Sequence, residues 1–319
     1  MNFRTVGQMS ASIARNLDKL PVDIDVIVGI PRSGCLAANI LALHLNLPMT
    51  DVQGLLEGKL MDGGRRLRDN IPDDPRLCKK VLVLDDSILS GKSIEKVRRQ
   101  LENAEIQAEV IYATVYGTSR SEDSVDICFE ICEWPRMFEW NYMHHEFLRQ
   151  ACVDIDGVLC VDPSKDQNDD GPRYREFILT APPLYIPSRK VFALVTSRLE
   201  KYRSETEEWL TRNGVEFDHL FMLDLPDGDT RRRLNCHARF KADIYSKLKT
   251  TRIFIESNRR QAVEIARLAK RPVICVGTCE LIDSSIRSRS KRKAESVLRK
   301  LRYGVQRRLK RFGERVASP

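Results

Sequence analysis

No run of apolar residues in this sequence is long enough to cross a bilayer, and Met1–Lys19 is polar, without a secretory signal pattern. Histidine is scarce, with five residues in 319, and the nine cysteines show neither CxxC nor Cys/His ligand spacing. These shortages argue against a membrane-spanning protein, a zinc site and a disulfide framework. The sequence therefore predicts a cytoplasmic protein with reduced thiols.

Positive charge is concentrated at the C-terminal end. The net charge is +8, but Ser284–Pro319 contains thirteen Lys and Arg against two Glu, so the rest of the chain carries a net −3. Within this stretch apolar residues recur every three or four positions, at Val297, Leu301, Val305, Leu309, Phe312 and Val316. The pattern predicts a basic amphipathic helix suited to an anionic membrane surface, such as the inner face of the cytoplasmic membrane. A helix that packs back on the protein or binds nucleic acid non-specifically is the alternative.

Residues 81–94 are the most informative stretch. Val81–Leu84 is an apolar, strand-like run, the carboxylates Asp85 and Asp86 follow it, and an amphipathic helix is predicted to begin near Lys92. The loop between them is made of small hydroxyl residues and glycine, with Ser87, Ser90, Gly91 and Ser93. A loop that leads into a helix N-terminus binds anions, because unpaired backbone N–H groups and the helix dipole point at the ligand. The two carboxylates add acceptors for a sugar diol beside a phosphate.

A second loop of this kind lies upstream. The strand-like Val26–Val28 runs into Gly29–Gly34, and a helical run then extends through Leu45. Arg32 within the loop is a charge partner for a diphosphate. Alternating strands and helices predict an α/β fold with a parallel sheet.

The two loops together resemble the pyrophosphate and phosphoribosyl pyrophosphate (PRPP) loops of type I phosphoribosyltransferases, which have a Rossmann-like parallel sheet. The resemblance implies that Asp85 and Asp86 hold the ribose 2- and 3-hydroxyls at the catalytic centre, with Mg²⁺-PRPP as the donor. The PRPP-binding residues that it implies are Arg32, Ser33, Gly34, Asp85, Asp86, Ser87, Ser90, Gly91, Lys92 and Ser93. Leu89 departs from the family, which usually has a hydroxyl residue there, so one phosphate contact is expected to be missing.

Two further segments fit this resemblance. Gly54–Pro75 is rich in glycine and charge, at the place where the family has a loop that closes over the pyrophosphate. A solvated charged loop is the alternative. Asp126–His145, with Trp134 and Trp140, lies where the family has the variable hood that selects the acceptor. Its aromatic rings suit a sugar face, a nucleobase or a packed interface between domains.

The second half of the chain contains four more motifs. Ala151–Leu159 is a strand that ends in Asp154 and Asp156, whose spacing makes both project from the same end. The others are a buried strand that ends at Thr196 and Ser197, Lys241 at the start of a helical stretch, and a strand that ends at Glu256, Ser257 and Asn258.

These motifs, in this order, resemble those of the haloacid dehalogenase-like (HAD) phosphatases. The resemblance implies that Asp154 is the nucleophile, Asp156 the general acid and base, and Thr196 and Lys241 the groups that stabilise the phosphoryl oxygens. A Mg²⁺ ion would be held by Asp154, the backbone carbonyl of Asp156, and Glu256. Glu256 and Asn258 depart from the family, whose fourth motif usually supplies aspartates, so a longer carboxylate and a neutral side chain are expected at the metal site.

Val161–Pro187 separates the first two phosphatase-like motifs and is predicted to form a small cap. Arg198, Lys201 and Arg203 either reach the substrate or form the solvated face of a helix. The predicted domains are a transferase with its hood over 1–149, a HAD-like Rossmannoid domain over 150–283, and the basic tail over 284–319.

The order of the domains predicts a bifunctional enzyme. A phosphoribosyltransferase product still carries a 5-phosphate, which the second domain would remove. The arrangement resembles fused phosphoribosyltransferase–HAD proteins that install ribofuranose in bacterial surface polysaccharides. The resemblance implies a lipid-linked glycan as the acceptor and a peripheral membrane location. Nucleobase salvage coupled to a nucleotidase, and a PRPP-sensing regulator that binds nucleic acid, are the alternatives. A homodimer is left open.

Overall fold

The computed structural model describes residues 1–61, 72–104 and 106–283, and the chain divides into two compact units, Met1–Asn141 and the part from Tyr142 onward. The predicted basic helix over 284–319, and Gly63, Gly64, Arg65, Arg66 and Arg68 of the predicted loop, lie outside the described residues. No helix of the described ranges is both long and apolar enough to span a membrane.

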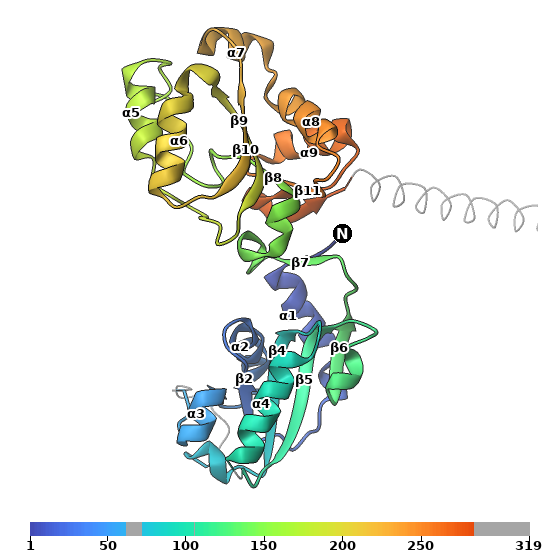
Figure 1. Ribbon diagram of the computed structural model, residues 1–319. Helices are drawn as coiled ribbons and strands as arrows, with labels where there is room; N and C mark the ends of the chain where they lie inside the picture. The colour runs from blue at the N-terminus through green and yellow to red at the C-terminus, as the bar shows by residue number, and fades with distance from the viewer. Residues whose placement is uncertain (62–71, 105, 284–319) are drawn as a thin grey trace, which may run out of the picture. The chain divides into compact units, whose positions relative to one another are not determined.

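The first unit contains a five-stranded parallel sheet in the order β3-β2-β4-β5-β6 (Figure 1). Its strands are β2 (Val26–Gly29), β3 (Met49–Asp51), β4 (Lys80–Ser87), β5 (Glu109–Gly117) and β6 (Ile127–Ile131). The short strands β1 (Asn2–Arg4) and β7 (Arg136–Phe138) form a separate parallel pair. The helices are α1 (Val6–Arg15), α2 (Ser33–Leu45), α3 (Val52–Glu57) and α4 (Lys92–Asn103).

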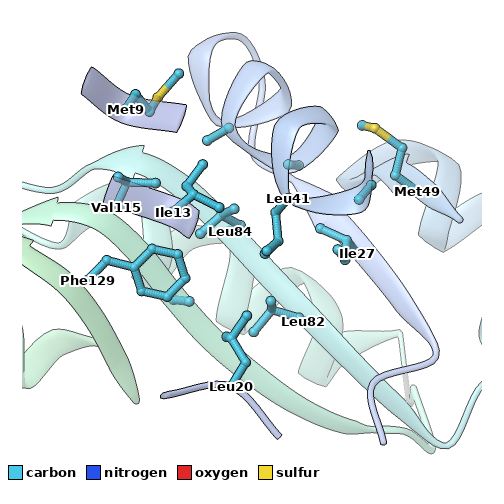
Figure 2. Close-up of a cluster of buried hydrophobic side chains, with 14 of the residues drawn as sticks. Met9, Ile13, Leu20, Ile27, Leu41, Met49, Leu82, Leu84, Val115 and Phe129 are labelled. Carbon is cyan, nitrogen blue, oxygen red and sulfur yellow. The ribbon is translucent and has the colours of Figure 1, made fainter. Parts of the chain in front are cut away.

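Helices cover both faces of this sheet, and this explains why its central strands are apolar throughout. Ile27, Leu82 and Leu84 face a core with α1 and α2, which Figure 2 shows with Met9, Ile13 and Leu41 from the helices. Val26, Val28, Val81 and Val83 face the opposite core, which contains Leu55 of α3 and Ile94, Val97 and Leu101 of α4. The predicted α/β fold with a parallel sheet is confirmed for this unit.

The second unit contains a six-stranded sheet in the order β10-β9-β8-β11-β12-β13, in which only β13 is antiparallel. Its strands are β8 (Ala151–Val153), β9 (Val191–Leu199), β10 (Phe217–Leu223), β11 (Ile253–Glu256), β12 (Val273–Cys275) and β13 (Glu280–Ile282). The helices are α5 (Pro172–Thr180), α6 (Arg203–Arg212), α7 (Gly228–Leu234), α8 (His237–Lys247) and α9 (Arg259–Ala269). Short 3-10 turns over 142–150 precede β8 and contact β8 and β9.

One face of this second sheet is covered by α8 and α9, whose Ala242, Tyr245 and Ile265 pack on Cys152, Val195 and Phe254. Figure 1 shows α5 and α6 on the other side of the sheet. Because β8, β9 and β11 are parallel neighbours, their carboxyl ends meet at one edge, which is where open α/β sheets bind ligands. The residues that follow these strands therefore define the second candidate site.

Candidate functional sites

The first candidate site lies at the carboxyl end of β4. Asp85 and Asp86 are both buried there, and the backbone N–H of Asp86 donates to Oδ1 of Asp85 at 2.9 Å. Burial, with the adjacent charge of Asp86, raises the pKa of Asp85 to about 8. The indole Nε1 of Trp140 donates to Oδ2 of Asp86 at 2.8 Å, so one carboxylate of the pair already has a fixed donor. The remaining oxygens are suited to hydroxyl groups or a cation.

The loop after these carboxylates leads directly into α4. Ser90 is exposed and Gly91, with φ of +71°, is the N-cap residue of the helix. A Cβ on Gly91 would lie 2.9 Å from Oγ of Ser124, so glycine is required by both conformation and space. No side chain caps this helix start, which leaves backbone N–H groups near Lys92 and Ser93 for a ligand.

The upstream loop reaches the same edge of the sheet. The pair Gly29 and Leu84 is in register between β2 and β4, and the N–H of Ile30 donates to the carbonyl of Leu84 at 3.0 Å. A Cβ on Gly34 would lie only 2.8 Å from that same carbonyl, so the first turn of α2 packs tightly on β4. Exposed Arg32, at the N-cap of α2, and Ser33 therefore lie on the loop next to the carboxylate pair.

A buried arginine holds the loop after β4 in place. Arg136 of β7 donates through NH2 to the carbonyl of Ile88, and through NH1 to the carbonyls of Tyr116, Gly117 and Cys132 at 3.2–3.3 Å. Oγ of Ser121 donates to the same Ile88 carbonyl at 3.3 Å. No sequence pattern indicates this role, because the partners are backbone carbonyls from three separate segments.

Aromatic residues of the predicted hood stack beside the carboxylates. The ring centroids of Phe138 and Trp140 are 4.9 Å apart, and those of Tyr116 and Phe138 are 5.5 Å apart. Trp140 is half-buried, so part of its ring remains open to a ligand, whereas Trp134 lies on the surface. Of the two tryptophans, Trp140 is the one that the structure brings to the site.

The second candidate site gathers Asp154, Lys241 and Glu256. Asp154 follows β8, Glu256 ends β11, and Lys241 of α8 lies between them with only 2 % of its surface exposed. Its Nζ donates to Oδ2 of Asp154 at 2.6 Å, Oε2 of Glu256 at 2.7 Å and Oε1 of Gln261 at 3.0 Å. Burial alone would lower the pKa of Lys241, but the two carboxylates raise it above its ordinary value. Lys241 is therefore a permanent cation at the centre of the site.

Asp154 itself experiences opposing effects. Burial and the charge of Glu256 raise the pKa of Asp154 to about 8, while Lys241 acts in the opposite direction. The carboxylate therefore needs further positive charge to remain ionised at neutral pH. Asn258, which the sequence placed in the metal motif, instead caps α9 by accepting from the N–H groups of Arg260 and Gln261.

Asp156 has a different partner. The fully buried Arg198 donates to it through NH2 at 2.6 Å from Oδ1, and through Nε at 3.2 Å from both carboxylate oxygens. Arg198 is thus neither exposed on a helix face nor free to meet a ligand. Lys201 pairs with Asp170, and Arg203 with Glu200 and Glu207.

The two hydroxyl residues at the end of β9 differ in their surroundings. Thr196 is fully buried, and its Oγ1 accepts from the N–H of Arg198 at 3.2 Å. The neighbouring Ser197 lines a cavity, and its buried Oγ has no hydrogen-bond partner among the described residues. Both hydroxyls therefore retain a hydrogen to donate, but the serine is the one that faces the open space.

That cavity has a volume of about 170 Å³, and its walls include Asp154, Asp156, Ser197, Arg231, Lys241 and Glu256. Within the described ranges no three His, Cys, Asp or Glu side chains form a group that could hold a metal ion on their own. Mg²⁺ usually takes one or two carboxylates and keeps several waters, and Asp154 and Glu256 with the carbonyl of Asp156 match that preference for oxygen. The donor chemistry thus fits Mg²⁺ with only part of its shell from protein.

Sequence reasoning missed several residues of these sites. Ser197 and Arg231 line the cavity, but neither was assigned a role there. Trp140 was placed in the predicted hood, but its hydrogen bond to Asp86 was not predicted. His237, at the start of α8, also lines the cavity, and burial with the charges of Arg231 and Lys241 lowers its pKa. A second hydroxyl residue directly after Thr196 at the end of the strand was a usable signal for Ser197. No local pattern marked Arg231, which lies in a short helix beside two other arginines.

Comparison with known proteins bears on the first unit. Residues 3–147 match the family model described as phosphoribosyl transferase domain, and no curated protein matches the chain. Similar solved structures include Helicobacter pylori xanthine-guanine-hypoxanthine phosphoribosyltransferase, with 17% identity over 44% of this chain and 92% of that chain and a TM-score of 0.32. A purine phosphoribosyltransferase from Pyrococcus horikoshii matches with 22% identity, the same shares and a TM-score of 0.33. The family model alone identifies residues 3–147 as a phosphoribosyltransferase domain.

Proposed function

We propose that this chain transfers a 5-phosphoribosyl group from PRPP to a glycan hydroxyl and then removes the 5-phosphate, so that plain ribofuranose remains on the acceptor. The premise is the phosphoribosyltransferase domain in residues 3–147. The observation that carries the second activity is that Asp154, Asp156, Lys241 and Glu256 line a single cavity at the carboxyl edge of a parallel sheet. A transferase domain and a second, acidic cavity on the same chain favour a protein with two activities.

The transfer step uses the residues around β4. Asp85 and Asp86 would hold the ribose diol while the bond from carbon 1 to pyrophosphate breaks and an oxocarbenium-like centre develops. The backbone N–H groups and hydroxyls of Ser87–Ser93 would bind the 5-phosphate, and Arg32, Ser33 and Gly34 the departing pyrophosphate. The acceptor hydroxyl then forms its bond to carbon 1 and loses its proton. Mg²⁺ enters here as part of the donor complex.

The phosphatase step uses the second cavity. A carboxylate oxygen of Asp154 attacks phosphorus, the bond from phosphorus to the sugar oxygen breaks, and Asp156 gives its proton to that oxygen. Water then attacks the aspartyl-phosphate while Asp156 takes its proton, which restores both carboxyl groups. Thr196 and Lys241 would donate to the phosphoryl oxygens. The pair of Asp156 with Arg198 fixes where this carboxyl group points.

A Mg²⁺ ion at Asp154, Glu256 and the Asp156 carbonyl would offset the repulsion between these carboxylates and a phosphoryl group. This fits the acidic surroundings of Asp154, whose pKa is raised by burial and by Glu256. Glutamate in place of the family's aspartate is compatible, because Lys241 binds Oε2 of Glu256 and the N–H of Asn258 binds Oε1, so the longer side chain is fixed at both oxygens.

The order of the two steps supports a glycan acceptor. Removal of the 5-phosphate makes the transfer effectively irreversible, which is an advantage when the sugar is added to a growing polymer. Nucleobase salvage, by contrast, would lose the phosphate that a nucleotide needs. The basic C-terminal stretch would hold the enzyme at an anionic cytoplasmic membrane surface, where lipid-linked glycans are assembled.

The acceptor class is tested with labelled Mg²⁺-PRPP, the full-length protein, a lipid-glycan extract and, separately, a panel of nucleobases, with mass analysis of the acceptors. Label in the glycan supports the proposal, and label in a nucleobase replaces it with salvage. Asp86→Asn should abolish transfer and leave hydrolysis of a simple phosphoester intact. No transfer to either class, together with tight RNA or DNA binding at physiological salt, would favour a PRPP-sensing regulator.

A further inference from the structure

The cavity of the second unit contains one cation whose charge is not matched. Lys241 is paired with Asp154 and Glu256, and Arg198 with Asp156. Arg231 has only 6 % of its surface exposed, and across the described residues it forms no ion pair with a carboxylate. A buried charge without a counterion is costly to keep, and this points to a partner that comes from outside the chain.

Neutral groups hold the guanidinium of Arg231 in a fixed position. NH1 donates to the carbonyl of Ser197 at 3.0 Å, and NH2 donates to Oδ1 of Asn168 at 3.1 Å. Its helix is tied down as well, because Asp170 accepts from the N–H of Gly228 at 2.7 Å and from Nζ of Lys201 at 2.9 Å. The position of Arg231 is therefore set before any ligand binds.

One nitrogen of this guanidinium has no partner among the described residues. Nε of Arg231 is buried and has no hydrogen-bond partner within the described ranges, and the same is true of Oγ of Ser197. Both residues line the cavity that also contains Asp154 and Lys241. Two unused donors and an unmatched positive charge in one cavity are complementary to an anion with several oxygens.

The geometry points to Arg231 and Ser197 as the binding site of the phosphoryl group in this cavity. Nε–H of Arg231 and Oγ–H of Ser197 donate to its oxygens. This inference rests on the proposed function, and it names residues that the four phosphatase-like motifs do not include in that role. A cavity of about 170 Å³ has room for a phosphate and a small part of its ester, so an oxyanion near Arg231 is also near Asp154. Arg231 thus compensates the repulsion that the carboxylates exert on a phosphate dianion.

Inorganic phosphate is the probe, titrated calorimetrically into the full-length protein with and without Mg²⁺. The loop after β4 also binds phosphate in the proposed function, so every variant is made in a Ser90→Asp background that places a carboxylate there. The variants are Arg231→Met, Arg231→Lys and Ser197→Ala. Arg232→Met is the matched control, because Arg232 lies next in the same helix, is exposed and pairs with Asp229.

Arg231→Met should weaken phosphate binding about tenfold or more, and Ser197→Ala less, while Arg232→Met leaves it unchanged. Melting temperatures separate this role from a purely structural one. Phosphate should raise the melting temperature of wild type and of Arg232→Met, and this rise should disappear in Arg231→Met, independently of any stability lost with the hydrogen bonds to Ser197 and Asn168. Arg231→Lys, which keeps the charge but lacks the Nε donor in this geometry, should bind with intermediate affinity, and it replaces the methionine variant if that one does not fold.

Equal phosphate affinity in wild type and Arg231→Met, no phosphate binding in either buffer, or the same phosphate-induced rise in melting temperature in both proteins would overturn the inference. The outcome is separable from the proposed function. If phosphate binds through Arg231 but no phosphoester is hydrolysed, the phosphate-binding role of Arg231 stands and the proposed phosphatase activity is wrong. If Arg231→Met hydrolyses a phosphoester with an unchanged KM, the phosphatase activity stands and the phosphate-binding role of Arg231 is wrong.

Discussion

The indole Nε1 of Trp140 donates a 2.8 Å hydrogen bond to Oδ2 of Asp86, which joins the segment after β7 to the carboxylate pair of β4. The rings of Phe138 and Tyr116 stack behind it and fix the indole. The orientation of one of the two carboxylates that would hold the ribose diol is therefore set by a residue of the predicted hood.

Trp140→Phe should retain the stack and lose the donor. A hydrogen bond to a charged group contributes about 1.5 to 3 kcal/mol, so we expect roughly a tenfold or larger fall in kcat/KM for PRPP. Steady-state transfer kinetics measure this, with Trp134→Phe as the control because Trp134 is half exposed on the surface. An equal fall in kcat/KM in Trp140→Phe and Trp134→Phe would contradict a specific role of Trp140.

Asp85→Asn should change how stability depends on pH. The pKa of Asp85 is about 8 in the folded protein against an ordinary value of 3.8, so between these values the folded state binds a proton that the unfolded state has released. The free energy of unfolding therefore falls as pH rises through this window. Asparagine cannot ionise. The free energy of unfolding of the variant should therefore rise relative to that of wild type as pH increases, by at most about 1.4 kcal/mol per pH unit.

Urea unfolding between pH 4.5 and 8 tests the prediction for Asp85. Asp123→Asn, at an exposed position of the same unit, is the control and should follow the wild-type profile. Parallel profiles for wild type and Asp85→Asn would show that the carboxyl group is not held protonated by its surroundings.

Arg136→Met should loosen the loop after β4. The change leaves the carbonyls of Ile88, Tyr116, Gly117 and Cys132 without this donor. The N–H groups of Ile88 and Cys132 still donate to the carbonyls of Tyr116 and Gly117, so what is lost is the set of hydrogen bonds from a charged group. Because such a bond contributes about 1.5 to 3 kcal/mol, we expect a clear fall in melting temperature and weaker PRPP binding. Arg120→Met, at an exposed position after β5, should change neither quantity. An unchanged melting temperature for Arg136→Met would contradict this role.

Lys241→Met should be the most damaging single change in the second unit. It leaves Asp154 and Glu256 buried without their shared cation, and loss of one partner of a buried ion pair costs about 3 to 5 kcal/mol. We expect phosphoester hydrolysis to disappear and the melting temperature to fall more at pH 8 than at pH 5, because ionisation of the carboxylates then goes unmatched. Lys247→Met, exposed at the end of the same helix, is the control. Equal melting temperatures for Lys241→Met and wild type would rule out this ion pair.

What the sequence predicts and what it misses have a common physical origin. Parallel strands bring their carboxyl ends to one edge, so residues that follow separate apolar runs, such as Asp154 and Glu256, were predictable neighbours. The direction of a side chain beyond a strand end depends on packing with distant segments. Thus the contacts of Asp86 with Trp140 and of Asp156 with Arg198, and the exposure of Ser197 to the cavity, emerge only from the folded chain.

The central claim is that the two sites act in sequence on one product, and Asp154→Asn tests it most directly. Labelled Mg²⁺-PRPP and the glycan acceptor are given to wild type and variant, and the mass of the attached sugar is measured. We predict a 5-phosphoribosyl group on the acceptor from Asp154→Asn and a ribosyl group without phosphate from wild type. The same phosphorylated sugar from both proteins would contradict the account.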